Sequence, residues 1–371
     1  MSSARPPLRA LFVNEGALGT GVLGHLRLRE ALTEHATGVE LHAVQLPPMP
    51  RASRLAVRDV PGLAALDADL QPVRWHAVQG LRLRRALAHT RAVRPQVVCV
   101  NTHTIALFAQ RPLARAPTVF MADASVWQWH AMGIWRTVRR HSRALIEPSL
   151  RRERRALEAA HLTLAATAWA ADGLRAVAPA ARIEVHHAGL DVERFRPAPR
   201  APGDRVRVLF VGGRFSAKGG HALIDALAPR LGADVTLDVV TPDPVAARPG
   251  VRVHRLSGAS PELVALYQQA DLLCLPTRGD AAPWVVLEAM ACATPVLATA
   301  IGGIPELVGD AGRLVPAGDQ PALERALAEL LADAAQREAL GAAARARMER
   351  HYDVRRQAPR FVEVLRAAAG S

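Results

Sequence analysis

The amino-acid sequence predicts an α/β protein with two doubly wound domains that face each other across a cleft. Short apolar segments, typical of buried parallel strands, alternate with segments of helical period. Residues 194–205, rich in proline and glycine, separate two such series. Each series opens with a strand and a glycine-rich turn, where backbone N–H groups can approach a ligand at the carboxyl edge of a parallel sheet.

The first series predicts an N-terminal domain over residues 1–195. Apolar or β-branched runs predict its strands at 8–13, 39–46, 95–101, 117–122, 162–168 and 181–189. Helical spacing predicts helices at 22–35, 80–93 and 170–178. The basic region 136–155 also has helical character, but we expect Pro148 to divide it into two short segments.

The second series predicts a C-terminal domain over residues 204–350. The same patterns predict strands at 206–212, 234–240, 251–256, 271–276 and 294–299. They predict helices at 221–231, 261–270, 284–293, 319–333, 335–350 and 354–369. In such sheets ligands bind beyond the carboxyl ends of the strands, so two facing domains place the site in the cleft between them.

The composition indicates a soluble globular protein. Of 371 residues, 50% are hydrophobic and 22% are charged, which excludes a disordered chain and fits two domains. Polar residues interrupt every long apolar run, so no membrane span is expected. The start shows no secretory signal, and three scattered cysteines fit a reducing compartment, so we expect a cytoplasmic location.

The net charge of +13 allows several partners: nucleic acid, an anionic membrane or phosphorylated ligands. A base composition that favours arginine codons explains it equally well, because 46 of the 47 basic residues are arginine. No zinc-finger, RRM or basic-zipper pattern accompanies the charge, so we expect no nucleic-acid partner. The densest basic run, 136–155, is either a solvated helix face or a patch that contacts anionic lipid at the inner face of the membrane.

The turn "VGGRFSAKGG" carries two cations, Arg214 and Lys218, just before an expected helix. Two cations beside a helix N-terminus favour a diphosphate site, although two solvated loop charges are common. Lys218 is the single lysine of the chain, so a compact ammonium stands where arginine is otherwise used.

In the stretch "PTRGDAAPWVVLEAMACATPVLATAIGGIPELV", residues 276–308, the carboxylates Asp280 and Glu288 lie eight residues apart. Pro283 suits the first turn of the helix that follows. Asp280 then lies in the loop before the helix and Glu288 about one turn inside it. "GGIP", after the next strand, predicts another tight turn at the same edge. Paired carboxylates could indicate glycoside hydrolysis, but the cations favour a phosphate-bearing sugar.

These two motifs, together with "IEVHHAGLDVERFRP", resemble glycosyltransferase family 4, enzymes of the GT-B fold that use nucleotide sugars. The similarity covers the C-terminal domain well and continues more loosely through "VVCVNTHT" and the first glycine-rich turn. It implies two Rossmann-like domains, with the donor held mainly by the second and the acceptor by the first. It also implies that the last helix, 354–369, packs back on the first domain.

The resemblance also implies roles for individual residues. Arg214 and Lys218 would bind the diphosphate, Glu288 the ribose hydroxyls and Asp280 the donor sugar. His103 matches a histidine that often lies at the sugar in this family. The remaining donor contacts implied are the backbone of Gly19 or Gly21 in the first turn and of Ala281, Ala282, Pro283 and Trp284 in the second domain.

Two departures from the family concern the sugar pocket. Asp280 stands where glutamate is usual, so the carboxylate reaches about one methylene less. Ala281 and Ala282 follow, where a glycine and an aromatic residue are frequent. These changes either alter the choice of donor sugar or weaken activity.

The resemblance implies a retaining, metal-independent transferase, with UDP the commonest carrier of the donor sugar. In such a transferase, Arg214 and Lys218 would stabilise the departing diphosphate, and His103 would orient the donor. The nucleotide sugar is a co-substrate, and no permanently bound cofactor is expected. The alternatives are an epimerase or hydrolase on the same fold, or a weakly catalytic nucleotide-sugar binder. A phosphorylase would need a lysine for pyridoxal phosphate, and the single lysine is already assigned.

The residues that we expect to bind the acceptor lie in the segment 121–135. Trp127 and Trp129 could stack on a sugar or apolar face, or pack in the core. Asp123 could cap the following helix or meet an acceptor hydroxyl, and His130 lies beside them. No metal site is expected, because the adjacent His186 and His187 would point to opposite faces of a strand.

Overall fold

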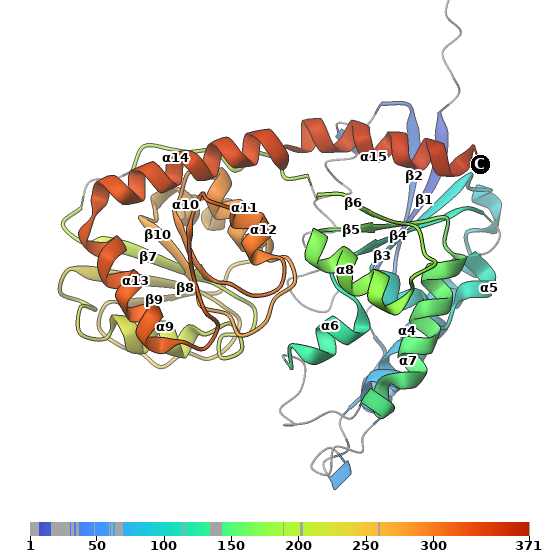
Figure 1. The fold of residues 1–371 in the computed structure, drawn as a ribbon, viewed down its shortest axis with the longest axis horizontal. Coiled ribbons are helices and arrows are strands. Elements are labelled where there is room, and N and C mark those ends of the chain that lie inside the picture. Colours follow the sequence, from blue (N-terminus) through green and yellow to red (C-terminus); the bar gives the residue numbers. More distant parts are fainter. Residues whose placement is uncertain are drawn as a thin grey trace, which may run out of the picture. The chain divides into compact units, whose positions relative to one another are not determined.

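The computed structural model divides the chain into two compact units (Figure 1). It describes residues 7–15, 30, 33–34, 37–47, 49–58, 60, 62–63, 70–113, 116–133, 143–187, 189–200, 203–258 and 260–370. Unit 1 contains the described residues up to 187 together with 357–370, and unit 2 contains 189–356. The division falls before the expected boundary at 195, because Leu190, Val192 and Phe195 are buried in the core of unit 2.

The sheet of unit 1 has six parallel strands in the order β2-β1-β3-β4-β5-β6. Its central strands are buried throughout, as expected of a parallel sheet with helices on both faces. The strands are β1 (Leu8–Asn14), β2 (Val39–Gln45), β3 (Val97–Asn101), β4 (Thr118–Ala122), β5 (Leu162–Ala165) and β6 (Ile183–Val185).

Eight helical segments belong to the described part of unit 1 besides the last helix. They are α2 (Arg51–Ala56), α4 (Gln71–Ala88), η1 (Arg91–Val93), η2 (His103–Ala106), α5 (Gln110–Leu113), α6 (Val126–Ala131), α7 (Arg143–Ala159) and α8 (Ala168–Val177). Helix α7 packs against both α4 and α8. The expected break at Pro148 is wrong: α7 runs through it. Leu150 and Leu157 of this helix are buried in the core of unit 1, and this packing outweighs the hydrogen bond that the proline lacks.

The sheet of unit 2 also has six parallel strands, in the order β12-β11-β10-β7-β8-β9. Its strands are β7 (Val206–Val211), β8 (Val235–Val240), β9 (Val251–His254), β10 (Leu272–Leu275), β11 (Val296–Thr299) and β12 (Arg313–Val315). The sequence analysis predicted all of these strands except the short β12.

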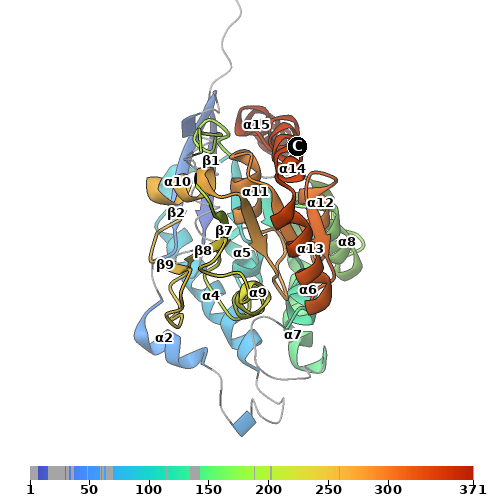
Figure 2. The same ribbon diagram turned by 90° about the vertical axis from the view of Figure 1, so that its left-hand side faces the viewer.

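The helices of unit 2 follow the predicted positions closely. They are α9 (Gly220–Leu227), α10 (Pro261–Gln269), α11 (Trp284–Ala291), α12 (Ile304–Val308), α13 (Gln320–Ala332) and α14 (Ala334–His351). Figures 1 and 2 show α13 and α14 side by side, and the two helices are in contact. The short α12 follows the "GGIP" turn and was not predicted as a helix.

The last helix, α15 (Val354–Ala369), joins unit 1 from residue 357 onward. Phe361 on this helix is buried, with its ring centroid 6.2 Å from that of Phe12 in β1 and 5.5 Å from that of His186. Arg366 donates a 2.7 Å hydrogen bond to the carbonyl of Gly38. These contacts anchor the end of the chain on the edge of the sheet of unit 1.

Each sheet reverses its strand order once. In unit 1 the chain passes from β1 outward to β2 and then returns to β3 on the other side of β1. In unit 2 it passes from β7 through β8 to β9 and returns to β10 on the other side of β7. In unit 1 the loops after β1 and β3 therefore diverge and leave a crevice between them. In unit 2 the loops after β7 and β10 do the same. Doubly wound proteins bind ligands at crevices of this kind.

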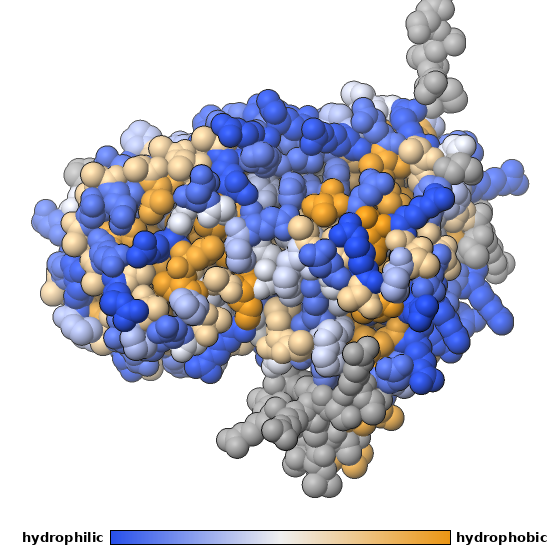
Figure 3. Space-filling view, viewed as in Figure 1, coloured by the Kyte–Doolittle hydropathy of each residue, from blue (hydrophilic) through white to orange (hydrophobic). Residues whose placement is uncertain are grey.

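On the face shown in Figure 3, hydrophilic residues surround several small groups of apolar residues. Within the described ranges, no helix combines the length and the apolar composition needed to cross a bilayer.

Candidate functional site

Three loops of unit 2 meet at the carboxyl edge of its sheet. They follow the neighbouring strands β7, β10 and β11. The N–H of Arg278 donates to the carbonyl of Ala217 (3.3 Å), and the N–H of Gly303 donates to the carbonyl of Ala281 (2.7 Å). The loop after β10 is thereby tied to both of its neighbours, and the predicted motif residues come together.

Two glycines allow these loops to approach so closely. Gly219 and Gly302 have φ of +81° and +61°, a conformation that side chains disfavour. A Cβ on Gly219 would lie 2.0 Å from the carbonyl oxygen of Pro276, and one on Gly302 would lie 1.9 Å from that of Asp280. Larger residues at either position would push the loop after β10 away from its neighbours.

Lys218 and Asp280 form an ion pair within this loop cluster. The ammonium Nζ of Lys218 donates to Oδ2 of Asp280 and also lies 3.3 Å from the carbonyl oxygen of Gly279. The side chains are 18% and 14% exposed, so the pair is largely shielded but still reachable from solvent. The sequence analysis assigned the two residues to separate parts of the donor and did not predict this pairing.

Glu288 lies on the second turn of α11 and is only 3% exposed. Its Oε2 accepts a 2.7 Å hydrogen bond from the hydroxyl of Tyr267 on α10. Tyr267 is itself fully buried and donates from a fixed position. The tyrosine was missed by the sequence analysis, although the chain has only two tyrosines, which could have marked it for attention.

Helix α11 begins directly beside the ion pair. The helix begins at Trp284, as expected, with Pro283 at its N-cap and not in its first turn, and it ends at Ala291 instead of Ala293. The first N–H groups of a helix have no partner within it and can bind an anion. Ala281 is buried and Ala282 half-buried. Of the four expected backbone donors, Pro283 is excluded because it has no N–H.

Arg214 is exposed at the start of the turn that Lys218 closes, and its carbonyl accepts a 2.9 Å hydrogen bond from the N–H of Lys218. The same turn is fixed to the neighbouring loop, because the N–H of Phe215 donates to Oδ2 of Asp243 (2.8 Å). Arg214 therefore precedes Lys218 by four residues within the same turn, and its side chain is exposed to solvent.

In unit 1, His103 lies in η2, directly after β3, and is fully buried. Its Nε2 lies 2.7 Å from Oε1 of Glu153 on α7. The same Glu153 oxygen accepts a 2.8 Å hydrogen bond from the N–H of Val126, at the start of α6. Nδ1 of His103 and Oε2 of Glu153 are buried without a hydrogen-bond partner in the described structure. His103 is therefore held in one orientation by a buried carboxylate.

A second histidine lies behind this pair. Nδ1 of His76, on α4, lies 2.9 Å from Oγ of Ser149, on α7. Burial and the nearby His103 lower the pKa of His76 to about 3. His76 is therefore neutral at physiological pH.

A further polar group surrounds Glu15, the residue directly after β1. Its Oε1 accepts a 2.6 Å hydrogen bond from Nε2 of Gln79 on α4. Gln79 in turn accepts from Arg82, which also donates to the carbonyl of Pro47. Burial raises the pKa of Glu15 to about 7, against the opposing effect of the Arg82 guanidinium. The carboxyl of Glu15 can therefore gain or lose a proton near neutrality.

The predicted acceptor-side residues cluster around α6. Ser125 and Gln128 form a capping box at its N-terminus, so the suggestion that Asp123 caps this helix is wrong. Oδ1 of Asp123 instead accepts a 3.3 Å hydrogen bond from the indole N–H of Trp129. Trp127 is 36% exposed, with its ring 5.8 Å from that of His130. The two tryptophans diverge as expected, and Trp127 is the one that solvent reaches.

Some predicted residues lie outside the described part of the chain. Gly19 and Gly21 are among them, together with the expected helix 22–35, apart from a few of its residues, and residues 136–142 of the basic run. In the described remainder of that run, Arg151 and Arg154 pair with Glu147 and Glu158. Across the described residues, no group of three or more His, Cys, Asp and Glu side chains could hold a metal ion.

Several polar residues were missed by the sequence analysis: Glu15, His76, Gln79, Arg82, Glu153 and Tyr267. Glu15 could have been found as an acid directly after a buried strand, and Glu153 as the acid inside "RRERR". Gln79 and Arg82 carry no such signal, because ordinary polar residues on a helix are usually solvated.

Known proteins share both the fold and part of the sequence. Sucrose-phosphate synthase from Thermosynechococcus elongatus superimposes with a TM-score of 0.74 at 20% identity, covering 99% of this chain and 100% of that one. HepE from Anabaena, in complex with UDP-glucose, gives 0.68 at 18% identity, covering 97% and 100%. Two doubly wound parallel sheets of this kind define the GT-B class, as the sequence predicted.

The sequence comparison is more specific for unit 2. Residues 205–333 match the model of the family described as Glycosyl transferases group 1. D-inositol 3-phosphate glycosyltransferase of Salinispora tropica is 36% identical over 197 residues, which cover 42% of this chain and 40% of the relative. Among the relatives of this name, the matched part spans 31% to 53% of their length. The predicted resemblance to a glycosyltransferase family is confirmed.

Proposed function

We propose that the protein transfers a sugar from a nucleoside diphosphate sugar to a hydroxyl group of an acceptor, and that unit 2 binds the donor. The ion pair of Lys218 and Asp280, beside the first turn of α11 and at the crevice between β7 and β10, carries this proposal. A cation and free helix N–H groups suit a diphosphate, while a carboxylate suits sugar hydroxyls. Both kinds of group are present within one loop cluster.

In this proposal Lys218 binds the diphosphate together with Arg214, and Asp280 contacts the donor sugar. Glu288 binds the ribose, with Tyr267 fixing its carboxylate through the 2.7 Å hydrogen bond. As the bond between sugar and phosphate breaks, negative charge grows on the leaving diphosphate. Preorganised donors at such a position lower the barrier by about 3 kcal/mol each. UDP is the proposed carrier, supported by the UDP-glucose complex of a protein with the same fold.

We propose that the transfer retains the anomeric configuration of the donor sugar and requires no metal ion. The acceptor hydroxyl attacks from the face that the diphosphate leaves, and its proton passes to a phosphate oxygen. His103 orients the donor and is itself oriented by Glu153 (2.7 Å). The acceptor, a small molecule, glycolipid or glycan, is proposed to contact Asp123, Trp127, Trp129 and His130. Relatives named for inositol phosphate support a polyol as acceptor.

The proposal is tested with Lys218→Ala and Lys218→Arg, assayed by transfer from a panel of nucleotide sugars. Removing the ammonium is expected to lower kcat by a factor of about 100 to 1000. Lys218→Arg keeps the positive charge but changes its shape, so it should retain more activity than Lys218→Ala. Wild-type kcat and KM in Lys218→Ala would contradict the phosphate role.

Product analysis by mass spectrometry separates the alternatives. A transferase joins the sugar to the acceptor, whereas an epimerase or hydrolase changes or releases the sugar without any acceptor. Strict loss of transfer in EDTA would contradict the metal-free chemistry.

We propose a cytoplasmic location, with α7 and the basic residues before it as the surface that contacts anionic lipid. The excess of arginine on this helix supports it, although two of these arginines are paired with glutamates. Sedimentation with anionic vesicles, compared with neutral ones, tests this contact.

A further inference from the structure

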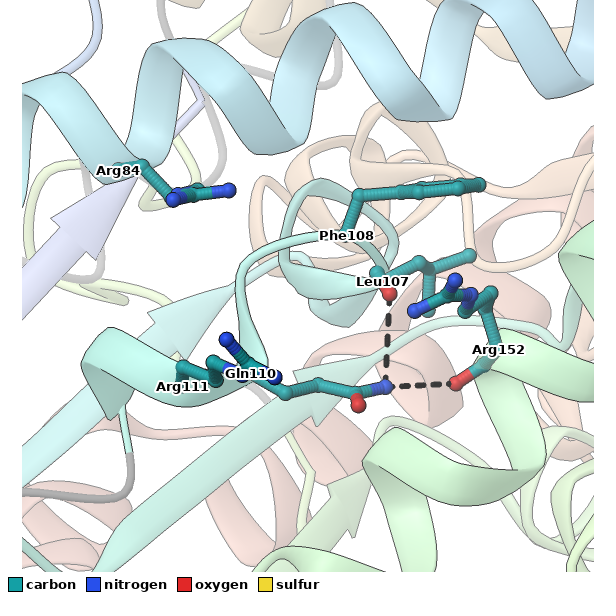
Figure 4. A pocket seen from close by; sticks show the side chains of 6 residues that line it. All are labelled: Arg84, Leu107, Phe108, Gln110, Arg111 and Arg152. Atoms are coloured by element: carbon teal, nitrogen blue, oxygen red, sulfur yellow. Dashed lines mark hydrogen bonds between the residues drawn. The ribbon is translucent and has the colours of Figure 1, made fainter.

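Unit 1 contains a pocket that neither the donor nor the acceptor site uses. It has a volume of about 270 Å³ and lies between α4, the end of η2, α5 and α7 (Figure 4). Six residues line it: Arg84, Leu107, Phe108, Gln110, Arg111 and Arg152. Three of the six are arginines, and they come from three different helices.

The three arginines are not neutralised by their surroundings. In the part of the chain that the structure describes, no carboxylate forms an ion pair with Arg84, Arg111 or Arg152. Figure 4 shows the guanidinium of Arg84 extending from α4 toward the same space that the side chain of Arg111 enters from α5. Three like charges around one hollow repel one another, so an anion between them would be stabilised.

The walls of the pocket are fixed by specific contacts. Nε2 of Gln110 donates to the carbonyls of Arg152 (3.0 Å) and Leu107 (3.4 Å), and so joins α5 to α7. The guanidinium of Arg152 lies over the ring of Phe108, 5.2 Å from its centroid. Gly80 allows Phe108 to approach α4 closely, because a Cβ there would lie 2.6 Å from that of Phe108. The pocket is thus preorganised on rigid elements.

A second hollow of about 710 Å³ adjoins the first and shares Arg84 and Arg111. It adds a fourth arginine, Arg94, and an apolar surface that includes Leu87 and Leu113. The combination of guanidinium groups and an adjacent apolar floor suits a ligand with a charged head and a carbon chain. Guanidinium groups form paired hydrogen bonds with carboxylates and phosphates alike, but several of them around one hollow suit the higher charge and the additional oxygen of a phosphate.

We propose that this pocket binds a phosphate monoester, with Arg84, Arg111 and Arg152 holding the phosphate and the Leu87–Leu113 surface holding an attached apolar chain. The phosphate comes either from a lipid headgroup or from a free phosphorylated metabolite. None of the residues that line this pocket is among those that we assign to the donor or to the acceptor.

The experiment is isothermal titration of the full chain with two probes, inorganic phosphate and hexyl phosphate, in the absence of any nucleotide sugar. Arg84→Gln and Arg111→Gln are each expected to weaken binding by about tenfold, the loss of one charge-assisted contact. The matched control is Arg85→Gln, which removes the neighbouring exposed charge on α4 that does not line the pocket. Circular dichroism verifies that the variants, all at exposed positions, remain folded.

Tighter binding of hexyl phosphate than of inorganic phosphate is the expected result, because its carbon chain can pack on the Leu87–Leu113 surface. Equal binding of the two probes would overturn the role of that surface. An equal effect of Arg85→Gln and Arg84→Gln would show general attraction to a basic surface and overturn the proposal. The absence of binding of either probe to the wild type at millimolar concentration would overturn it as well. Because no donor is present, failure here leaves the proposed transfer untouched.

Discussion

The two units share a strand-order reversal but place different chemistry at it. In unit 2 the crevice between β7 and β10 carries the partly accessible pair of Lys218 and Asp280. In unit 1 the crevice between β1 and β3 is followed by His103 and Glu153, both fully buried. Charges that solvent can reach are able to exchange partners with a ligand. Buried groups are fixed by the protein, because separating them leaves unpaired charge or unmade hydrogen bonds.

The comparison indicates that the cluster in unit 2 serves ligand binding and that the cluster in unit 1 serves stability. In the function that we propose, the ion pair of unit 2 opens, since a diphosphate would offer Lys218 a replacement for Asp280. In unit 1 the carboxylate of Glu153 joins η2 to α6, and its loss would affect the fold before it affects a ligand. Stability and catalysis should therefore respond differently to substitutions in the two clusters.

The largest expected effect is on stability, from Glu153→Ala. Its Oε1 serves both the imidazole of His103 and the N–H of Val126, and the truncation leaves both groups buried without that partner. The free energy of unfolding should fall by about 3–5 kcal/mol, as for other buried pairs that lose one member. Urea denaturation monitored by circular dichroism measures it.

The matched control is Glu158→Ala, on the same helix, where the glutamate pairs with Arg154 at the surface. This substitution should cost less than about 1 kcal/mol. Similar losses in both variants would show that the cluster around His103 is no more structural than a surface ion pair, and the comparison between the units would fail.

The second prediction is a loss of transfer activity in the variant Asp280→Asn of unit 2. The amide oxygen can still accept a hydrogen bond from Lys218, so the loops should stay in place. Transfer should fall by about 100-fold, because the carboxylate that we propose to contact the sugar is gone. Binding of UDP alone should not weaken, since Lys218 loses its competing anion. Steady-state kinetics and calorimetry together measure this split between kcat and nucleotide affinity.

Asp225→Asn, at an exposed position on α9, serves as the control for general loss of negative charge and should leave both quantities unchanged. Weaker binding of UDP to Asp280→Asn, in parallel with its lower kcat, would instead make Asp280 a structural support of the loops.

The sequence predicted unit 2 better than unit 1 for a physical reason. Strands buried on both faces and helices such as α10 have clear periodicity, and the Lys218 and Asp280 motifs lie in loops directly after strands. The buried network of unit 1 forms between helices that are far apart in sequence. Nothing local marks Gln79 or Arg82 as a buried partner, because each would be an ordinary solvated helix residue in isolation.

Pro148 shows a second limit of predicting structure from local sequence. A proline is a local signal for a helix break, yet α7 continues through it, with Leu150 and Leu157 buried in the core of unit 1. Tertiary packing of an amphipathic helix outweighs the loss of one hydrogen bond. Local propensity therefore predicted the position of the helix but not its continuity.

The last expected effect is the pH dependence of stability caused by Glu15 in unit 1. Burial raises its pKa from 4.5 to about 7, so in this pH window the folded state holds a proton that the unfolded state has released. Glu15 therefore makes the free energy of unfolding fall as pH rises through the window, by at most about 1.4 kcal/mol per pH unit. His76 and His186, whose pKa values are lowered to about 3 and about 4, act in the opposite direction.

The contribution of Glu15 is isolated by comparing the wild type with Glu15→Gln, which keeps an acceptor for Gln79 but cannot titrate. Urea denaturation at several pH values should show the stability of the variant gaining on that of the wild type as pH rises from 4.5 to 7. Above this window the difference should stay constant, because Glu15 is then ionised in both states. Parallel curves throughout would mean that Glu15 is as solvated as an ordinary surface glutamate. The crevice of unit 1 would then be open to water like that of unit 2, and the contrast between the two would rest on His103 and Glu153 alone.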